Sequence, residues 1–201
     1  METTDKTYFE LAKRPFQDVP VTEQGVDTAA FLEACEDVVK MFDLFGSPAF
    51  AVVQNDMNGN IKKIRDRFLA HPDKSMTLED LVNNEKGEKK RVATEGLMWL
   101  LRGLDFTCKA LTINRENPSE ELSVSFTKAY EQTLKKFHSF VVRPLFSLAM
   151  KACPYRATFY PKLGNPPEKV DQELEKWLAA LASIVSRMQT FYTTGGHEKG
   201  L

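Results

Sequence analysis

Three polar side chains follow one another at helical spacing after Ser47-Pro48. Asp56, Asn60 and Lys63 occupy positions i, i+4 and i+7, which places them on adjacent turns along one flank of a helix. They offer a carboxylate acceptor, an amide that donates and accepts, and a cation with several donors. A polyhydroxylated ligand requires this mixture, because each of its hydroxyls both donates and accepts. The alternative is an ordinary solvated helix face, the usual setting of charged residues.

Trp99 lies away from the apolar stripe of its own helix. At about 100° per residue, a helix over 91–114 has one broad stripe formed by Ala93, Leu97, Leu100, Leu101, Leu104, Cys108 and Leu111. Trp99, Arg102 and Phe106 project elsewhere, and Gly96 and Gly103 beside them leave space for a close neighbour. Either a second layer of helices packs on this face, or the indole stacks on a flat ligand and donates its N–H.

His138 is the third candidate for a functional site. It lies on the flank of an expected helical face formed by Phe126, Tyr130, Leu134, Phe137, Val141, Leu145 and Leu148. A single histidine in this setting is more often a hydrogen-bonded core residue. With Asp56 it could act as a general base, but no nucleophile motif, metal-ligand spacing or Gly-rich phosphate loop accompanies it. We therefore predict a binding protein that uses no metal and no cofactor, rather than an enzyme.

Helices must position all of these residues, because helical periodicity dominates and strand-like alternation is absent. The expected elements are an N-terminal polar leader, helices at 27–45, 48–70, 77–84, 91–114 and 168–192, a long segment at 118–152 that Pro144 must kink or divide, and a polar tail from Gly195. The 201 residues with 42% apolar content fit a single all-α domain over 1–201, with its core at about 27–193.

The charge and cysteine content restrict the function further. The 27 Lys and Arg balance 28 Asp and Glu, so no net field attracts nucleic acid. Cys35, Cys108 and Cys153 are odd in number and widely spaced, which favours free thiols in a reducing compartment. No secretory signal core and no run of about 18 apolar residues occurs. The sequence predicts a soluble cytoplasmic protein.

Six sequence motifs, in order, resemble those of the glycolipid transfer protein family. They are Phe45-Gly-Ser-Pro48, Asp56-Met-Asn-Gly-Asn60-Ile-Lys-Lys63, Ala93-Thr-Glu-Gly-Leu-Met-Trp99-Leu-Leu-Arg-Gly-Leu104, Ala129-Tyr-Glu131, Leu134-Lys-Lys-Phe-His138 and Ala152-Cys-Pro-Tyr-Arg156. The resemblance extends over about 42–163 and is greatest to the fungal heterokaryon-incompatibility members. It implies two stacked layers of helices that enclose a hydrophobic lipid cavity, and a non-enzymatic carrier that transfers a glycosphingolipid between membranes.

The same resemblance implies a role for each candidate residue. Asp56 and Asn60 bind sugar hydroxyls, Lys63 adds a donor, and Trp99 stacks on the sugar ring. His138 meets the amide oxygen of the ceramide. The residues at positions similar to those that line the lipid-chain cavity are Phe42, Val53 and Phe146.

Two features of the chain depart from the family pattern. The family's membrane-contacting Trp is Phe140 here, which keeps the docking role with weaker interfacial anchoring. The segment 192–201 does not resemble the aromatic tail of the animal members. The expected partners are simple glycosylceramides and, transiently and peripherally, a membrane surface, with the protein a monomer.

Two other functions remain possible from the residues alone. One is a carrier of ceramide 1-phosphate, and the other is a lipid-sensing interaction module without net transfer. Phosphate-selective relatives have Lys where Asn60 stands and Arg where Trp99 stands, so the resemblance favours a sugar headgroup.

Overall fold

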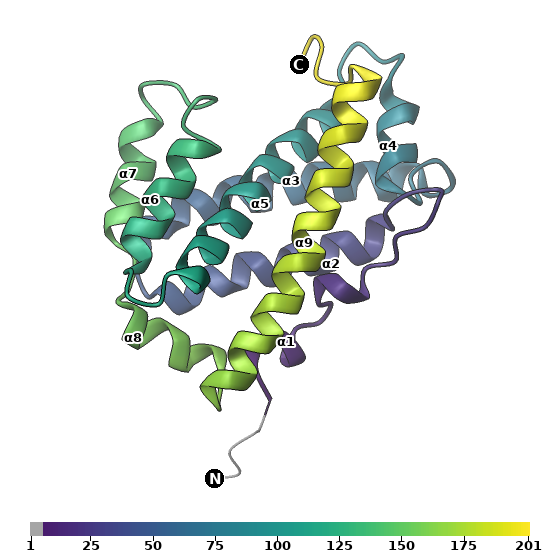
Figure 1. Cartoon of the computed structure of the whole chain (residues 1–201). Helices are drawn as coiled ribbons and strands as arrows, with labels where there is room; N and C mark the ends of the chain where they lie inside the picture. Colours follow the sequence, from purple (N-terminus) through teal and green to yellow (C-terminus); the bar gives the residue numbers. More distant parts are fainter. Residues whose placement is uncertain (1–5) are drawn as a thin grey trace.

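The chain is almost entirely helical in the computed structural model, which describes residues 6–201. Within these residues, β pairing is limited to isolated bridges at Val21–Val26 and Asp27–Thr77. The α-helices are α1 (Tyr8–Leu11), α2 (Thr28–Met41), α3 (Ala51–Ala70), α4 (Leu78–Glu85), α5 (Val92–Glu116), α6 (Leu122–Gln132), α7 (Arg143–Lys151), α8 (Arg156–Phe159) and α9 (Pro167–Gly195) (Figure 1). Short 3₁₀ turns lie at Phe16–Asp18, Phe42–Phe45, Pro48–Phe50, Pro72–Lys74 and Tyr160–Leu163. The predicted all-α class is confirmed.

Local sequence signals set the boundaries of the helices around the site. The Asp27 carboxylate accepts from the Ala30 N–H and caps α2. Gly46 adopts a left-handed conformation with φ 68°, which ends the Phe42–Phe45 turn, and Ser47 then caps the turn that leads into α3. The Thr77 hydroxyl accepts from the Asp80 N–H at the start of α4. Asp27, Ser47 and Thr77 are of the residue types preferred at helix N-caps.

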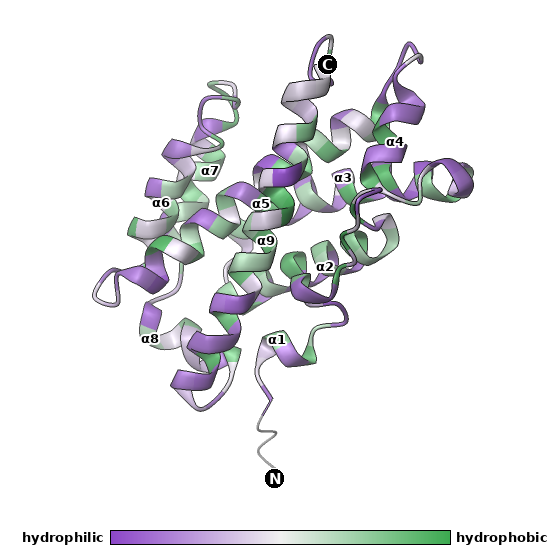
Figure 2. Cartoon of the chain, turned by 45° about the vertical axis from the view of Figure 1, so that its right-hand side comes forward, coloured by the Kyte–Doolittle hydropathy of each residue, from purple (hydrophilic) through white to green (hydrophobic). Residues whose placement is uncertain are grey.

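The helices stack in two layers around α5, which packs against α3, α6 and α9. In Figure 1, α9 crosses in front of α2, and α3 lies behind α5. Figure 2 shows hydrophobic and hydrophilic positions on the same helices, as expected for amphipathic elements that share a core. The second face of α5 is occupied as predicted, because the buried Phe106 ring meets Phe126 and Tyr130 of α6 with centroid distances of 5.7 and 6.3 Å.

The core extends beyond the limits that the sequence suggests, which corrects the interpretation of the N-terminus as a polar leader. Phe9 and Phe16 are buried and pack on the Trp177 ring of α9, with centroids 5.5 and 5.3 Å away. Val19 is buried as well. Scattered aromatic residues between charged ones hid this contribution, since the segment lacks helical periodicity.

The C-terminal tail is also folded against the domain, in contrast to the free polar tail expected from Gly195. His197 is buried and stacks on Phe191 with centroids 4.6 Å apart. The Arg91 guanidinium donates to the His197 carbonyl at 2.9 Å and to the Lys199 carbonyl. The tail therefore covers the end of α9 and the start of α5.

The helix expected over the long segment 118–152 ends twelve residues before Pro144, at Gln132. Helix α6 ends at Gln132, a turn spans 133–142, and Pro144 lies in the first turn of α7, where its missing N–H costs nothing. The single apolar face predicted for this segment is wrong beyond Leu134. Its later members are exposed, namely Phe137, Val141, Leu145 and Leu148.

Two further sequence expectations can be compared with the structure. None of the helices in residues 6–201 is long and apolar enough to cross a membrane. The three cysteines are free thiols, with Cys35 and Cys108 buried and Cys153 half-buried.

Candidate functional site

One pocket of about 500 Å³ brings together the three groups of candidate residues. Helix α3 supplies one wall, α5 a second, and the 133–142 turn with α7 the third. The pocket is lined by Val52, Asp56, Asn60, Lys63, Glu95, Trp99, Phe137, His138, Ser139, Val142, Leu145 and Phe146. All four residues expected at the headgroup, with His138 and Phe146, thus face the same space.

The α3 wall is a row of hydrogen-bonding groups held at different depths. Asn60 is only 4% exposed, and its Oδ1 accepts from the Lys63 Nζ at 3.4 Å. The Asn60 amide N–H groups therefore remain available to a ligand. Asp56 lies one turn earlier, at the accessible rim of the pocket, where the surrounding protein partly excludes water from its carboxylate. This desolvation raises the pKa of the Asp56 carboxyl, and the nearby Lys63 charge opposes the rise.

Gly96 sets the distance between the α3 and α5 walls. A Cβ at this position would lie 3.1 Å from the Lys63 Cβ and Cδ atoms and 3.4 Å from the Asn60 carbonyl oxygen. Helix α5 therefore approaches α3 so closely that any side chain at this position would require the Lys63 side chain to shift by a few tenths of an ångström. Gly96 is three residues before Trp99, and the close neighbour for which it leaves space is α3.

Trp99 occupies the boundary between the core and the pocket. Its side chain is half-buried. The ring meets Phe137 edge-on with centroids 6.4 Å apart, and lies within 20° of parallel to the His138 ring at 6.1 Å. On the second face of α5, Phe106 therefore packs on another layer of helices and Trp99 lines a pocket. Stacking of the indole on a flat ligand stays a prediction.

His138 is held in place by Tyr130 and Phe146. The Tyr130 hydroxyl lies 3.1 Å from His138 Nδ1, and the Phe146 ring lies 4.4 Å from the imidazole. Burial lowers the pKa of His138, and the Arg143 charge lowers it further, so the neutral ring is favoured at neutral pH. When the Tyr130 hydroxyl donates to Nδ1, the ring proton resides on Nε2 and can be donated to a carbonyl oxygen.

Sequence reasoning missed two polar residues at this site. Glu95 adds a second carboxylate to the pocket, and Tyr130 orients the imidazole. Glu95 precedes Trp99 by one helical turn, so spacing alone could have found it. Tyr130 was assigned to the apolar core, and it is indeed buried. No signal in the sequence gives its hydroxyl a partner, because that partner follows the end of α6.

The residues expected at the lipid chains divide into two groups. Phe146 lines the pocket and stacks on Tyr130 with centroids 5.5 Å apart and planes within 12°. Phe42 and Val53 are buried in the core, where Phe42 stacks on Phe50 at 5.6 Å. They do not line this pocket, and their contact with a lipid chain stays a prediction.

Exposed apolar side chains gather next to the pocket. Phe140 is 83% exposed at the turn between α6 and α7. Val141, Leu145 and Leu148 are also exposed, and Leu145 lines the pocket. We call Phe140, Val141, Leu145 and Leu148 the apolar patch. Such a patch on a single chain is typical of an interaction surface.

The pocket is typical of a lipid-binding protein, because hydrogen-bonding groups and an indole line one side of it and mostly apolar side chains line the other. Within residues 6–201, no group of three or more His, Cys, Asp or Glu side chains is placed to hold a metal ion. Residues 26–165 match the family model "Glycolipid transfer protein (GLTP)". The chain belongs to the glycolipid transfer protein family.

Three comparisons place it within that family. The chain is 54% identical over 185 residues to a glycolipid transfer protein of Aureobasidium melanogenum, and the match covers 92% of each chain. The crystal structure of the fungal glycolipid transfer protein HET-C2 matches with a TM-score of 0.90 at 49% identity, covering 93% of this chain and 97% of that one. A structure of FAPP2, described as selecting simple glycosphingolipids with this fold, has a TM-score of 0.88 at 30% identity and covers 96% and 98%.

Proposed function

We propose that this protein binds a glycosphingolipid and carries it between membranes without breaking a covalent bond. The observation that carries the proposal is that Asp56, Asn60, Lys63, Trp99 and His138 line one pocket whose remaining lining is mostly apolar. Such an arrangement suits a ligand with a polar head and an apolar body. The fungal relatives named above are described as glycolipid transfer proteins.

The sugar is recognised by the α3 wall and the indole. Asp56 accepts from sugar hydroxyls, and the free Asn60 amide N–H groups donate. Lys63 adds a further donor, while Trp99 supplies a flat surface for the sugar ring. A wrong headgroup leaves these groups unpaired, at about 1–3 kcal/mol for each lost partner.

The ceramide amide and chains occupy the other side of the site. His138 Nε2 donates to the amide oxygen, and Phe146 contacts the beginning of the chains. Phe42 and Val53 line the deeper path and separate when the chains enter. Each CH₂ removed from water contributes about 0.8 kcal/mol, so enclosing two chains removes most of the cost of crossing water.

A neutral sugar headgroup fits this pocket better than a phosphate. Asp56 and Glu95 place two carboxylates at the site, which would repel a phosphate monoester. Lys63 is the one cation among the pocket-lining residues. These charges favour simple glycosylceramides over ceramide 1-phosphate, the runner-up ligand.

The apolar patch brings the pocket to a bilayer. Phe140 and its neighbours enter the interfacial region while the pocket mouth faces the lipid, and Arg143 and Lys151 on α7 contact headgroups. The protein acts as a cytoplasmic monomer that is peripheral and transient at the membrane. No metal or cofactor takes part.

Vesicle-to-vesicle transfer tests this function. Donor vesicles containing labelled glucosylceramide, ceramide 1-phosphate or sphingomyelin are mixed with acceptor vesicles, and the transfer rate of each lipid is measured. We expect glucosylceramide to move and the phosphate-bearing lipids to remain. Binding of glucosylceramide without transfer would instead support a lipid-sensing module.

A further inference from the structure

We propose that Arg102 is a positioning residue for the Trp99 platform. Its guanidinium carbon lies 4.8 Å from the centroid of the Trp99 ring and 3.6 Å from that of Phe137. The inference rests on the proposed function, in which Trp99 stacks on the headgroup. Neither the motifs nor the pocket lining assigns Arg102 a role.

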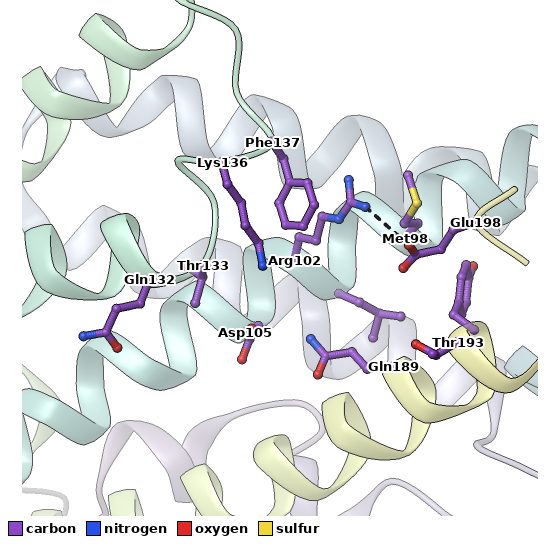
Figure 3. Close-up of a pocket in the computed structure, with 12 residues that line it drawn as sticks. Met98, Arg102, Asp105, Gln132, Thr133, Lys136, Phe137, Gln189, Thr193 and Glu198 are labelled. Carbon is purple, nitrogen blue, oxygen red and sulfur yellow. Dashed lines mark ion pairs between the residues drawn. The ribbon is translucent and has the colours of Figure 1, made fainter. Parts of the chain in front are cut away.

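Arg102 approaches the indole from the side away from the headgroup pocket. It lines a second cavity of about 290 Å³ between α5, the end of α6 and α9, whereas Trp99 lines the headgroup pocket. Phe137 lines both and forms the wall between them. Figure 3 shows Arg102 extended beneath the Phe137 ring, with Lys136 alongside and Glu198 opposite.

The aromatic contacts hold Arg102 more strongly than its ion pair does. Glu198 of the tail approaches Arg102 at 4.0 Å, the outer limit of an ion pair, and is itself largely exposed. Exposed ion pairs at such distances contribute little. The Arg102 side chain is only 16% exposed, so its contacts with two rings are partly desolvated and correspondingly stronger.

Loss of this cation would release two rings at once. Phe137 is also approached by Lys136, whose Nζ lies 4.9 Å from the ring centroid, but Lys136 is exposed. Trp99 has no other cation over its ring among the contacts in residues 6–201. Without Arg102, the indole can rotate into the second cavity and leave the headgroup without its stacking surface.

The variants Arg102→Met and Arg102→Lys test this role, with Arg115→Met as the matched control. Arg115 is on the same helix, about 20 Å along its axis from Arg102, and pairs with Asp171 and Glu175. Three properties are measured: the affinity for short-chain glucosylceramide, the thermal midpoint, and acrylamide quenching of tryptophan emission without ligand. Quenching reports Trp99, because Trp177 is only 2% exposed.

We expect Arg102→Met to weaken binding about tenfold, the scale of a partly desolvated cation–π contact, and to make Trp99 more quenchable. Arg102→Lys should retain part of the affinity and part of the protection of Trp99 from quenching. Arg115→Met should change neither the affinity nor the quenching. Unchanged quenching and affinity in Arg102→Met would overturn the proposal, as would equal losses in Arg115→Met. If the parental protein fails to bind glucosylceramide, the proposed function is wrong, while quenching of the unliganded variants still decides whether Arg102 positions the ring.

Discussion

The Trp99 indole and the His138 imidazole lie within 20° of parallel, with ring centroids 6.1 Å apart. One ring comes from α5 and the other from the turn after α6, so tertiary packing alone brings them together. They lie next to each other where two walls of the pocket meet. In the proposed complex the two rings bind the junction between sugar and ceramide, because the indole faces the sugar and the imidazole faces the amide.

Trp99→Ala should weaken glucosylceramide binding by tenfold or more, about 1.4 kcal/mol or above, and leave the fold intact. The half-buried ring serves as a platform at the pocket rather than as a core anchor. Titration with short-chain glucosylceramide and thermal melting provide the two readouts. The control is Trp177→Ala, which removes a buried core ring and should cost about 3–5 kcal/mol of stability. Loss of helical structure in Trp99→Ala would assign that ring to the core instead.

Asp56→Asn should reduce glucosylceramide transfer at least tenfold, because the sugar hydroxyls lose a charged acceptor at about 1–3 kcal/mol. Stability should not fall. The raised pKa of Asp56 means that folding disfavours its charged form, so this group's contribution to stability declines as pH rises through its titration range. The uncharged amide of the Asp56→Asn variant removes this cost of burying a charge. Asp66→Asn, at an exposed position of the same helix, should leave transfer unchanged.

The raised pKa also predicts how binding depends on pH. As pH falls, Asp56 gains its proton at a higher pH than an ordinary aspartate does, and its charge as an acceptor is lost. Glucosylceramide affinity should therefore decline on acidification, and the Asp56→Asn variant should show a flatter profile. Parallel profiles for the two proteins would mean that Asp56 does not contact the sugar.

Tyr130→Phe should weaken ceramide recognition several-fold, on the order of 1 kcal/mol. Without the hydroxyl 3.1 Å from Nδ1, the imidazole is no longer held with its Nε2 proton toward the ligand. An alkyl glucoside, which has the sugar but no amide, is the matched ligand and should bind equally well to both proteins. If both ligands weaken to the same extent, Tyr130 supports the pocket as a whole rather than the amide contact.

Phe140→Ala should slow transfer between vesicles more than it weakens binding of soluble short-chain glucosylceramide. The residue is 83% exposed and lies outside the pocket, so its proposed contact is the bilayer. Leu69→Ala is the control, since Leu69 is also exposed but lies about 25 Å along α3 from Val52 at the pocket. Equal losses in both assays would remove Phe140 from the docking surface.

The sequence was sufficient to predict the helices that carry the α3 and α5 walls, and four of the side chains that face the pocket from them. Asp56, Asn60 and Lys63 share a flank because of helical spacing, and Trp99 lies off the apolar stripe for the same reason. These are properties of single helices, which periodicity describes well. Glu95 was accessible to the same reasoning.

Other features depend on where the chain breaks and what packs on it. The end of α6 at Gln132 has no proline or glycine to mark it, and extending the helix past it placed Phe137 and Leu148 wrongly in the core. Phe9 and Phe16 join the core through Trp177, more than 150 positions away in the sequence. The Tyr130–His138 contact likewise requires the turn, which no local pattern specifies.

The central claim is that side chains of α3 and α5 determine which lipid headgroup is bound. The double variant Asn60→Lys with Trp99→Arg tests this claim most directly. Two cations on facing helices, together with Lys63, would form a charge-assisted phosphate clamp where the amide and the indole had been. The measurement is the ratio of transfer rates of glucosylceramide and ceramide 1-phosphate between vesicles. We expect glucosylceramide transfer to fall at least tenfold and ceramide 1-phosphate to be taken up. Parental glucosylceramide transfer with no uptake of the phosphorylated lipid would contradict the account.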